Sequence, residues 1–399
     1  MSILEQLEAC LNRRTKRGLR RRLHVSDPNW IDFCSNDYLG LAQNCRFHAL
    51  VSAERENSGI TMGSTGSRLL TGNHQYHECV EEELKDFYQT EATLLFNSGY
   101  MANLGVLSSV PQTHDMILYD AEIHNSTRTG IQLSRADSSS FHHNNVVSLE
   151  HLLIQHTCRT RNVFVVVESL YSMDGTQAPL KELVTLCQSY PRTYLIVDEA
   201  HSTGCYGHEH GAGLLEELGL AGQVFCSIHT FGKAMGCHGA VVCGSTTLKQ
   251  YLINYARSLI YSTSLPFHSV AAIRVAHRLV ATEGQSWRKQ LKANIAYFTQ
   301  QLKHKTYKVL PSKTAIQGIV VAGNEAVNFV AQELQQLGFY VLPIRSPTVD
   351  SGTERLRVVL HANHTKQEMD GLIQALDQLL LKRTTTSEAS SAVMLRSRY

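Results

Sequence analysis

The sequence predicts an α/β fold with a mostly parallel sheet, and two observations carry this prediction. Between about Tyr38 and Leu265, six short apolar runs are each bounded by polar or glycine-containing segments, which is typical of strands buried on both faces. Helical patterns lie between the runs, as in residues 76–88, where apolar positions share one face opposite an acidic one. Strands that alternate with helices build a parallel sheet covered by helices. The six runs are TLLFNSGY, DMILYD, NVFVVVES, TYLIVDEAH, QVFCSIHT and GAVVCG.

After Pro266 the pattern changes, and we expect a second, smaller α/β domain. A helical pattern over residues 326–338 stops at a glycine, and strands are expected at 339–344 and 355–362. Thr365 and Glu368 form a capping box for a last helix. The predicted domains are 1–37, a basic helix and arm; 38–265, the large domain; 266–382, the small domain; and 383–399, a polar tail that we expect to be disordered.

The first 25 residues read as a basic amphipathic helix, with seven cations between Arg13 and Arg22. Such a run is a solvated helix face, a nucleic-acid patch or a site for an anionic substrate. The formal net charge of the chain is only +2, which argues against bulk affinity for nucleic acid. No apolar run is long enough to span a bilayer and no signal-peptide core is visible, so we expect no membrane partner and a cytoplasmic location. The 10 cysteines contain no C-x-x-C pair, so no metal site is expected.

Three strand endings carry polar groups that point to chemistry. One buried run ends with Asp198 and then His201; another ends with Thr230 and then Lys233. A third buried run is followed by Gly99 and Tyr100, just before a predicted helix. Because ligands of open α/β sheets bind outside the carboxyl ends of the strands, we expect these endings to converge.

Each ending suits one part of pyridoxal phosphate. A helix N-terminus at residues 98–100 would bind a phosphate, and Thr230 could add a hydroxyl donor. Asp198 is costly to bury unless it pairs with a cation such as a protonated pyridine nitrogen. Lys233 could form a Schiff base with an aldehyde. Each residue has a simpler explanation when it is considered alone. Asp198 would be a helix cap or an ion-pair partner, His201 would be a hydrogen-bonded loop residue, and Lys233 would be a solvated lysine. Considered together, the three residues predict a cofactor site. The Walker and G-x-G-x-x-G phosphate motifs are both missing.

Nine motifs occur in an order and spacing that resemble the α-oxoamine synthases, pyridoxal-phosphate enzymes of the aspartate-aminotransferase-like fold (fold type I). The resemblance covers about Leu7 to Leu381, with Ser346 in place of a commoner proline. The motifs are CSNDYLGLA, GSTGSRLLTGN, FNSGYMANLGVLSS, DAEIHNSTRTGI, ESLYSMDGTQAPL, VDEAHSTGCYG, TFGKAMG, YSTSLP and IRSPTVDSGTERLRV.

The resemblance implies a role for each matching residue. Lys233 would be the Schiff-base lysine, Asp198 the partner of the pyridine nitrogen, and His201 the donor to the phenolic oxygen. His124 would stack on the ring and touch substrate. The phosphate region would be held by Gly99, Tyr100 and Thr230, with Ser172 as a further cofactor contact. The substrate would be bound by Arg20, Arg345 and Thr348.

The resemblance also implies a reaction, the decarboxylative condensation of a small amino acid with an acyl thioester of CoA or acyl carrier protein. In the biotin-pathway branch these are L-alanine and a pimeloyl thioester. The family forms its sites at a homodimer interface, where residues 261–264 could reach the partner's cofactor. Other branches use glycine or serine. A non-enzymatic regulator that binds the cofactor is a further alternative, but no helix-turn-helix pattern precedes the basic run.

Overall fold

The structure is a computed structural model that describes residues 1–58 and 63–396, with side chains described for 1–54 and 63–381. The chain divides into two compact units. The large unit comprises Asn36–Ser172 and Thr176–Leu291, and the small unit comprises Met1–Ser35, Met173–Gly175 and Lys292–Tyr399. In the described part of the chain, no helix is both long and apolar enough to cross a membrane.

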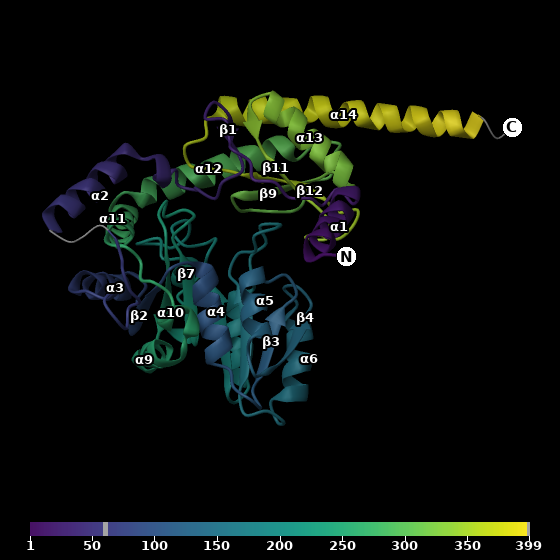
Figure 1. Ribbon diagram of the computed structural model, residues 1–399. Coiled ribbons are helices and arrows are strands. Elements are labelled where there is room, and N and C mark those ends of the chain that lie inside the picture. Colours follow the sequence, from purple (N-terminus) through teal and green to yellow (C-terminus); the bar gives the residue numbers. More distant parts are fainter. Residues whose placement is uncertain (59–62, 397–399) are drawn as a thin grey trace. The chain divides into compact units, whose positions relative to one another are not determined.

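The large unit is built on a seven-stranded sheet in the order β2-β8-β7-β6-β5-β3-β4 (Figure 1). Only β8 runs antiparallel to its neighbours within this sheet, so the predicted mostly parallel sheet is confirmed. Its central strands are apolar because helices cover both faces. The strands are β2 (Ala92–Phe96), β3 (Met116–Asp120), β4 (Asp137–Phe141), β5 (Val163–Glu168), β6 (Thr193–Asp198), β7 (Cys226–Thr230) and β8 (Ala240–Gly244).

One strand, β4, has no counterpart among the six predicted runs. Its sequence DSSSF places only Phe141 in the core, and the preceding four residues are exposed or half-buried. An edge strand needs one pairing partner and can carry polar side chains on a solvated face. The apolar run that identifies a central strand is therefore missing here.

The helices of the large unit follow the alternation predicted for a parallel sheet. They are α2 (Cys45–Ser58), α3 (Gln75–Phe87), α4 (Gly99–Ser109), α5 (Asn125–Gln132), α6 (Val146–His156), α7 (Leu180–Ser189), α8 (Leu214–Glu217), α9 (Thr246–Tyr255), α10 (Arg257–Ile260) and α11 (Phe267–Thr282), with short 3-10 helices at Leu41–Gln43 and Ala221–Gln223. Helix α12 (Gly284–Leu302) begins in the large unit and ends in the small one.

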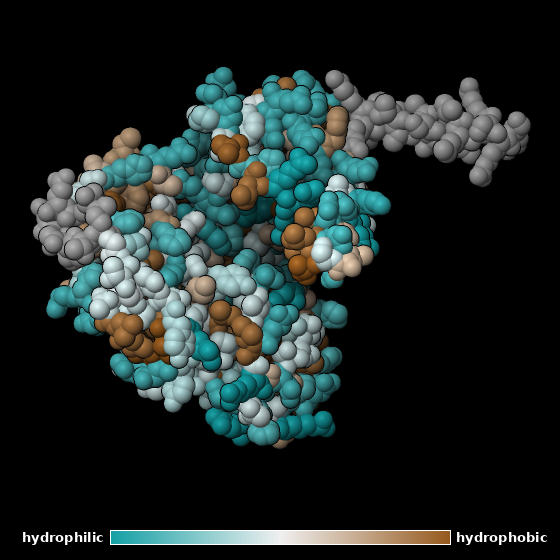
Figure 2. Space-filling view, in the orientation of Figure 1, coloured by the Kyte–Doolittle hydropathy of each residue, from teal (hydrophilic) through white to brown (hydrophobic). Residues whose placement is uncertain are grey.

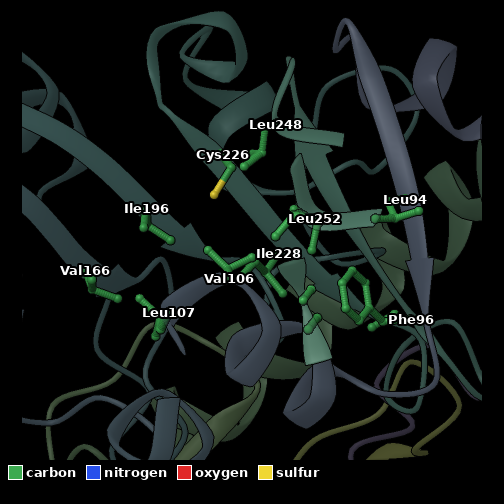
Figure 3. Packing of buried hydrophobic residues seen from close by; sticks show 14 of the residues in the cluster. Leu94, Phe96, Val106, Leu107, Val166, Ile196, Cys226, Ile228, Leu248 and Leu252 are labelled. Carbon is green, nitrogen blue, oxygen red and sulfur yellow. The ribbon is translucent and has the colours of Figure 1, made fainter. Parts of the chain in front are cut away.

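The core that positions the site lies between the sheet and helices α4 and α9. Val106 and Leu107 of α4 pack with Ile228 of β7 and Phe96 of β2, and Leu252 of α9 joins them (Figure 3). Burying each such side chain contributes about 1.5–3 kcal/mol, so the position of α4 on the sheet is strongly determined. The N-terminus of α4 is thereby fixed at the carboxyl edge of the sheet.

The small unit contains a three-stranded antiparallel sheet, β11-β12-β9, and a parallel pair, β1-β10. The strand predicted at 339–344 is divided between these two sheets at Val341. The elements are α1 (Ile3–Lys16), β1 (Ile31–Asp32), β9 (Ile316–Val320), α13 (Asn324–Gln336), β10 (Phe339–Tyr340), β11 (Leu342–Ile344), β12 (Arg355–Val359) and α14 (Lys366–Arg396).

Two expectations about chain segments differ from the structure. The N-terminal helix ends at Lys16, not near residue 25, because Gly18 adopts φ 65° and stops it. Helix α14 continues to Arg396, where a disordered tail was expected; a helix that has already nucleated extends at low cost per residue. Residues 397–399 of that predicted tail lie outside the described residues.

The division into units also differs from the predicted boundaries. Residues 266–291 belong to the large unit, and Met1–Ser35 belongs to the small one. Helix α11 explains the first difference, because it packs on α2 and α3 and buries ten of its residues. The change of sequence texture at Pro266 marks the start of that helix and not the end of a folding unit.

Candidate functional site

The Lys233 amine lies at one end of a chain of hydrogen bonds in the large unit. Its Nζ is 2.8 Å from His201 Nε2, and His201 Nδ1 is 2.6 Å from the hydroxyl of Tyr38. The Tyr38 hydroxyl also lies 3.2 Å from Asn36 Oδ1. His201 and Tyr38 are both buried. The two site residues that the sequence places on different strand endings therefore meet directly.

A tight turn between β7 and β8 presents Lys233. Phe231 N donates to Gly239 O at 2.9 Å, and Gly236 N donates to the Lys233 carbonyl at 2.9 Å. Gly236 has φ 60°, and a Cβ there would lie 2.5 Å from Ala42 N. A larger residue would therefore be strained and would displace the segment before α2. Both strands hold the turn, so the lysine backbone has a fixed position at the sheet edge.

Asp198 ends β6 and is held by two donors. Asn103 Nδ2, from α4, donates to Asp198 Oδ2 at 2.7 Å, and Ala200 N donates to Oδ1 at 2.9 Å. The same Asn103 nitrogen donates to Ser126 Oγ at 3.1 Å. Neutral donors keep the buried carboxylate solvated without neutralising its charge. The carboxylate remains able to pair with a cation.

His124 caps helix α5 and points one ring nitrogen into it. His124 Nδ1 accepts a hydrogen bond from Ser126 N at 3.2 Å and lies 2.8 Å from Ser126 Oγ. His124 is exposed, but neighbouring protein atoms desolvate its ring and lower its pKa; the Asp198 carboxylate opposes this shift and Lys233 adds to it. A neutral ring whose Nδ1 accepts carries its proton on Nε2, so His124 can donate from that atom.

Glu168 is a second buried carboxyl group at the same edge. It pairs in register with Asp198 on the neighbouring strand, and its Oε1 accepts a hydrogen bond from His124 N. Burial, followed by repulsion from Asp198, raises the pKa of Glu168 well above its usual range. The protein environment therefore favours the protonated form of Glu168 more than an exposed glutamate would experience, beside the carboxyl group of Asp198.

The start of α4 approaches β7 closely. A Cβ added to Gly99 would lie 3.1 Å from Thr230 Cβ, so a glycine allows the two segments to come together. Ser98 Oγ caps the helix through Met101 N at 3.3 Å, and Tyr100 is partly exposed with its hydroxyl bonded to Thr129. The backbone N–H groups at the start of α4 and the Thr230 hydroxyl, which donates to the Gly239 carbonyl at 3.4 Å, are donors that could bind an anion; this set is called the cradle below.

Ser172 and the three predicted substrate residues occupy other positions. Ser172 is buried four residues beyond Glu168, in the large unit. Arg20, Arg345 and Thr348 belong to the small unit. There Arg345 Nη1 donates to Gly18 O at 2.7 Å, two residues before Arg20, and Thr348 N donates to the Arg345 carbonyl at 2.9 Å. Within its own unit, this group brings the N-terminal arm and the residue 345–348 turn together.

These side chains fit pyridoxal phosphate. Lys233 would supply an amine for an aldehyde, Asp198 a carboxyl group for a protonated ring nitrogen, and the Gly99–Thr230 region hydrogen-bond donors for a phosphate. At Gly99 the start of α4 lies so close to Thr230 that a Cβ would fill the space between them. Within the large unit, the predicted residues thus lie on neighbouring strand ends and carry the chemistry that this cofactor needs.

Sequence reasoning missed Tyr38, Asn103, Ser126 and Glu168. A signal existed for Glu168, since it ends a buried run just as Asp198 does. Tyr38 lies in CSNDYLGLA and Asn103 in FNSGYMANLGVLSS, but neither stands at a strand ending. Their roles come from side chains that meet across elements, and no local pattern indicates such contacts.

A cavity of about 650 Å³ lies elsewhere in the large unit. Its lining includes Ser108 and Ser109 at the C-terminal end of α4, together with Tyr251 and Arg257. The predicted cofactor residues lie at the opposite end of α4. We therefore place the candidate site by its side-chain chemistry and not by cavity volume.

Comparisons with known proteins agree with this chemistry. The family model described as aminotransferase class I and II matches residues 28–376. An 8-amino-7-oxononanoate synthase of Emericella nidulans is 39% identical, covering 93% of this chain and 94% of that protein. A serine palmitoyltransferase of S. paucimobilis with a bound PLP–myriocin aldimine has TM-score 0.86 and 27% identity, covering 96% and 100%. An 8-amino-7-oxononanoate synthase of Francisella tularensis has TM-score 0.75 and 28% identity, covering 91% and 100%.

Proposed function

Because the chain belongs to the aminotransferase class I and II family, we propose that this pyridoxal-phosphate enzyme is an 8-amino-7-oxononanoate synthase of biotin synthesis. The reaction would condense L-alanine with a pimeloyl thioester, of CoA or of acyl carrier protein, and release CO2 and the free thiol. The observation that supports it best is the Lys233 amine 2.8 Å from His201 Nε2, at the sheet edge that also carries Asp198.

The residues of the large unit would divide the work as follows. Lys233 would hold the cofactor through Nζ, Asp198 would bind the ring nitrogen and His201 the phenolic oxygen. The cradle of Gly99, Tyr100 and Thr230 would hold the phosphate, and Ser172 would be a further contact. The bound cofactor supplies an electron sink that stabilises negative charge at the amino acid's α-carbon.

Proton movements would then fall to side chains whose positions are known. Lys233 Nζ, when free, can take the α-proton and later return it, and His201 Nε2 lies within hydrogen-bond reach of that atom. His124, neutral with its proton on Nε2, would donate to the thioester oxygen as negative charge develops there. The raised pKa of Glu168 would disfavour a second negative charge beside Asp198.

The arginines of the small unit would bind the carboxylates of the substrates. Arg345, with Thr348, would hold the amino-acid carboxylate, and Arg20 the distal carboxylate of the pimeloyl chain. We expect Arg20→Ala to raise KM for the pimeloyl thioester about tenfold or more, since a charge-assisted hydrogen bond contributes about 1.5–3 kcal/mol. The variant should leave KM for alanine within about twofold. Arg22→Ala, in the same basic run, is the matched control; equal changes in both KM values would contradict the assignment of Arg20.

A homodimer would complete the proposal. Apolar side chains of α1 are exposed, with Ile3, Leu4 and Leu7 at 66%, 73% and 54%, and Figure 2 shows hydrophobic surface at the place of α1. Tyr261, in the YSTS segment, is 76% exposed. A second copy of the chain would cover such surface. Light scattering of the purified protein at micromolar concentration should give the mass of a dimer.

A second candidate, a serine palmitoyltransferase-like reaction, is favoured by the higher TM-score of that neighbour, 0.86 against 0.75. We prefer the first because an 8-amino-7-oxononanoate synthase is 39% identical over 93% of this chain, whereas the two solved neighbours, at 27% and 28% identity, do not separate the candidates. The deciding experiment incubates the enzyme with alanine, serine or glycine and with pimeloyl, palmitoyl or acetyl thioesters. Mass spectrometry should find 8-amino-7-oxononanoate as the main product; a product from serine or from a long acyl chain would overturn the proposal.

A further inference from the structure

Glu199 is a fully buried residue of the large unit that the proposed reaction leaves without a role. It follows β6 directly, precedes His201 by two residues and is 0% exposed. Its carboxyl group accepts three hydrogen bonds: Leu214 N donates to Oε2 at 2.8 Å, Leu215 N donates to Oε1 at 2.9 Å, and the Ser202 hydroxyl donates to Oε2. Burying a carboxyl group is costly, and donors from two separate segments of the chain offset that cost here.

The main chain of Glu199 bonds to the sheet and to the turn that contains His201. Its N–H donates to the Ile228 carbonyl of β7 at 2.8 Å. Its carbonyl accepts from Ser202 N at 3.2 Å and from Thr203 N at 2.9 Å, and the Thr203 hydroxyl donates to the same carbonyl at 2.7 Å. One residue therefore connects β7, the turn of residues 199–203 and, through its side chain, the start of α8.

A glycine allows the carboxyl group to reach the start of α8. Gly213 has φ 128°, and a Cβ on it would collide with Glu199 Oε2. A larger residue at this position would therefore displace the side chain of Glu199. The third donor extends the connection, because Ser202 Oγ lies 2.8 Å from the hydroxyl of Ser169, the residue that follows β5. The carboxyl group thus belongs to a packed network and not to a loose loop.

The ionised form of Glu199 suits these contacts. Burial raises its pKa to about 7, and the hydrogen bonds from Ser202, Leu215 and Leu214 oppose that shift by favouring the ionised form. A carboxylate only accepts hydrogen bonds, so each oxygen can bind a backbone N–H. In glutamine one oxygen is replaced by an NH2 group, which would face a backbone donor. Glu199→Gln therefore keeps the size of the side chain but loses at least one of its contacts.

We propose that Glu199 is a positioning residue for the cofactor site: its carboxylate ties the turn that carries His201 to the start of α8 and so fixes the backbone from which the imidazole projects toward Lys233. The ring itself contacts Lys233 Nζ at 2.8 Å and the Tyr38 hydroxyl at 2.6 Å. This inference rests on the proposed function, in which His201 binds the phenolic oxygen of pyridoxal phosphate, and it names the residue that keeps the histidine in place. Glu199 acts through His201 and needs no contact with the cofactor.

Asp115 provides a matched control in the same unit. It is 1% exposed; its Oδ2 accepts from Gln112 N at 2.8 Å and its Oδ1 accepts from Asn162 Nδ2 at 2.8 Å. Asp115 precedes β3 whereas Glu199 follows β6, and because β3, β5 and β6 are parallel, the two residues lie at opposite edges of the sheet. Asp115→Asn and Glu199→Gln each convert a buried carboxyl group into an amide, but only the second should loosen the turn of His201.

The first measurement is hydrogen exchange of the cofactor-free protein, followed by mass spectrometry at pH 8, where Glu199 is mainly ionised. The amides of residues 202 and 203 bond to the carbonyl of Glu199 and not to its side chain. We expect them to exchange at least about fivefold faster in Glu199→Gln, because loss of one buried hydrogen bond changes a local opening equilibrium by about that factor. Asp115→Asn should leave them within about twofold of the parent. Unchanged exchange in Glu199→Gln would contradict the proposal.

The second measurement asks whether Glu199 acts through His201. Pyridoxal phosphate is titrated into each variant and its binding is followed by absorption. Glu199→Gln should weaken binding about five- to tenfold, and Asp115→Asn less than about twofold. In a His201→Ala background, Glu199→Gln should weaken binding by less than about twofold, since no imidazole is left to misplace. Equal weakening in both backgrounds would show that Glu199 has only a structural role and would overturn the proposal.

A second variant covers the case in which Glu199→Gln does not fold, which its melting temperature reports. Ser202→Ala removes one donor and leaves both backbone contacts of the carboxylate in place. We expect it to speed exchange at residue 203 about threefold and to weaken cofactor binding only when His201 is present; no change in either would refute the proposal. A parent protein that takes up no pyridoxal phosphate would instead refute the proposed function, while the exchange measurement would still decide whether Glu199 holds the turn.

Discussion

Two buried tyrosine–histidine pairs of the large unit share their chemistry and differ in what surrounds them. In the Tyr38–His201 pair, the far nitrogen of the imidazole faces the Lys233 amine at 2.8 Å. In the Tyr88–His277 pair, the far nitrogen bonds to a backbone carbonyl, and the ring packs edge-on against Phe87 and Phe231 at 4.8 Å each. The first pair ends on a reactive group and the second on fixed backbone. A buried histidine therefore serves chemistry or packing according to its third neighbour.

The turn that carries His201 also contacts the surroundings of the Tyr88–His277 pair, through Thr203 and His229. Thr203, two residues after His201, lies 2.9 Å from His229 Nδ1, and the Tyr88 ring packs over His229 at 4.0 Å. Burial lowers the pKa of His229 to about 3 and that of His277 to about 4, so both rings are neutral at physiological pH. The Tyr88–His277 pair, called the packing pair below, thus lies against residues that hold the turn carrying His201.

The largest effect is expected when the reactive neighbour is removed. Lys233→Ala removes the amine beside His201, so that neither histidine of the two pairs contacts a reactive group. We expect product formation to fall by at least about 10³-fold, because no other group can replace a covalent amine. Product is measured by mass spectrometry, and cofactor attachment by borohydride reduction and peptide mapping. Lys181→Ala, an exposed lysine of α7, is the control and should retain activity within about twofold; a label found away from residue 233 would contradict the assignment.

A smaller effect, on stability, is expected from the packing pair. The folded pKa of His277, about 4, lies below its unfolded value, so the unfolded chain binds more protons and stability rises with pH. This contribution is complete above about pH 6.5 and is lost as the pH falls toward 4; at pH 5 the loss is about 2 kcal/mol. In His277→Gln, which cannot titrate, the difference in unfolding free energy between pH 7 and pH 5 should shrink by about that amount. Urea denaturation at both pH values measures it, and an unchanged difference would show that His277 titrates normally in the folded state.

The smallest effect tests the connection between the pairs. Thr203→Val keeps the side-chain shape but removes the hydroxyl, which also lies 2.7 Å from the Glu199 carbonyl. We expect a loss of about 1 kcal/mol in unfolding free energy, and a fall in product formation of less than about fivefold. Thr185→Val, an exposed threonine of α7 with the same hydroxyl-to-carbonyl contact, is the matched control. A fall in product formation of more than about fivefold, with a loss of unfolding free energy of only about 1 kcal/mol, would mean that this contact influences the reaction directly.

The contrast between the pairs also shows what sequence could and could not predict. Asp198 and Lys233 were predictable, because a polar group at the end of a buried strand is a local pattern and parallel strands share one edge. The Tyr38–His201 contact was not, since it joins residues 163 positions apart and depends on how a loop packs. The mostly parallel sheet followed from apolar runs, but β4 did not, because an edge strand need not be apolar.

The domain limits show the same distinction. The stop at Gly18 was readable, since a glycine that takes φ 65° commonly ends a helix, but the cationic run on both sides of it obscured the signal. Helix α11 was assigned to the wrong domain because its sequence reveals an apolar face but not the partner that covers it. Packing partners, unlike helix ends, are properties of the whole fold.

The place of β8 has a consequence for how the enzyme is made. This strand is the last of the large sheet in sequence, yet it lies between the first strand, β2, and the sixth, β7. A nascent chain that stops before Ala240 lacks the strand that pairs with both β2 and β7, so only side-chain packing through α4 can hold Gly99 near Thr230. Synthesis must therefore pass residue 244 before the hydrogen-bonded sheet is continuous from β2 to β7, and the proposed phosphate contacts at Gly99 and Thr230 would become rigid only then.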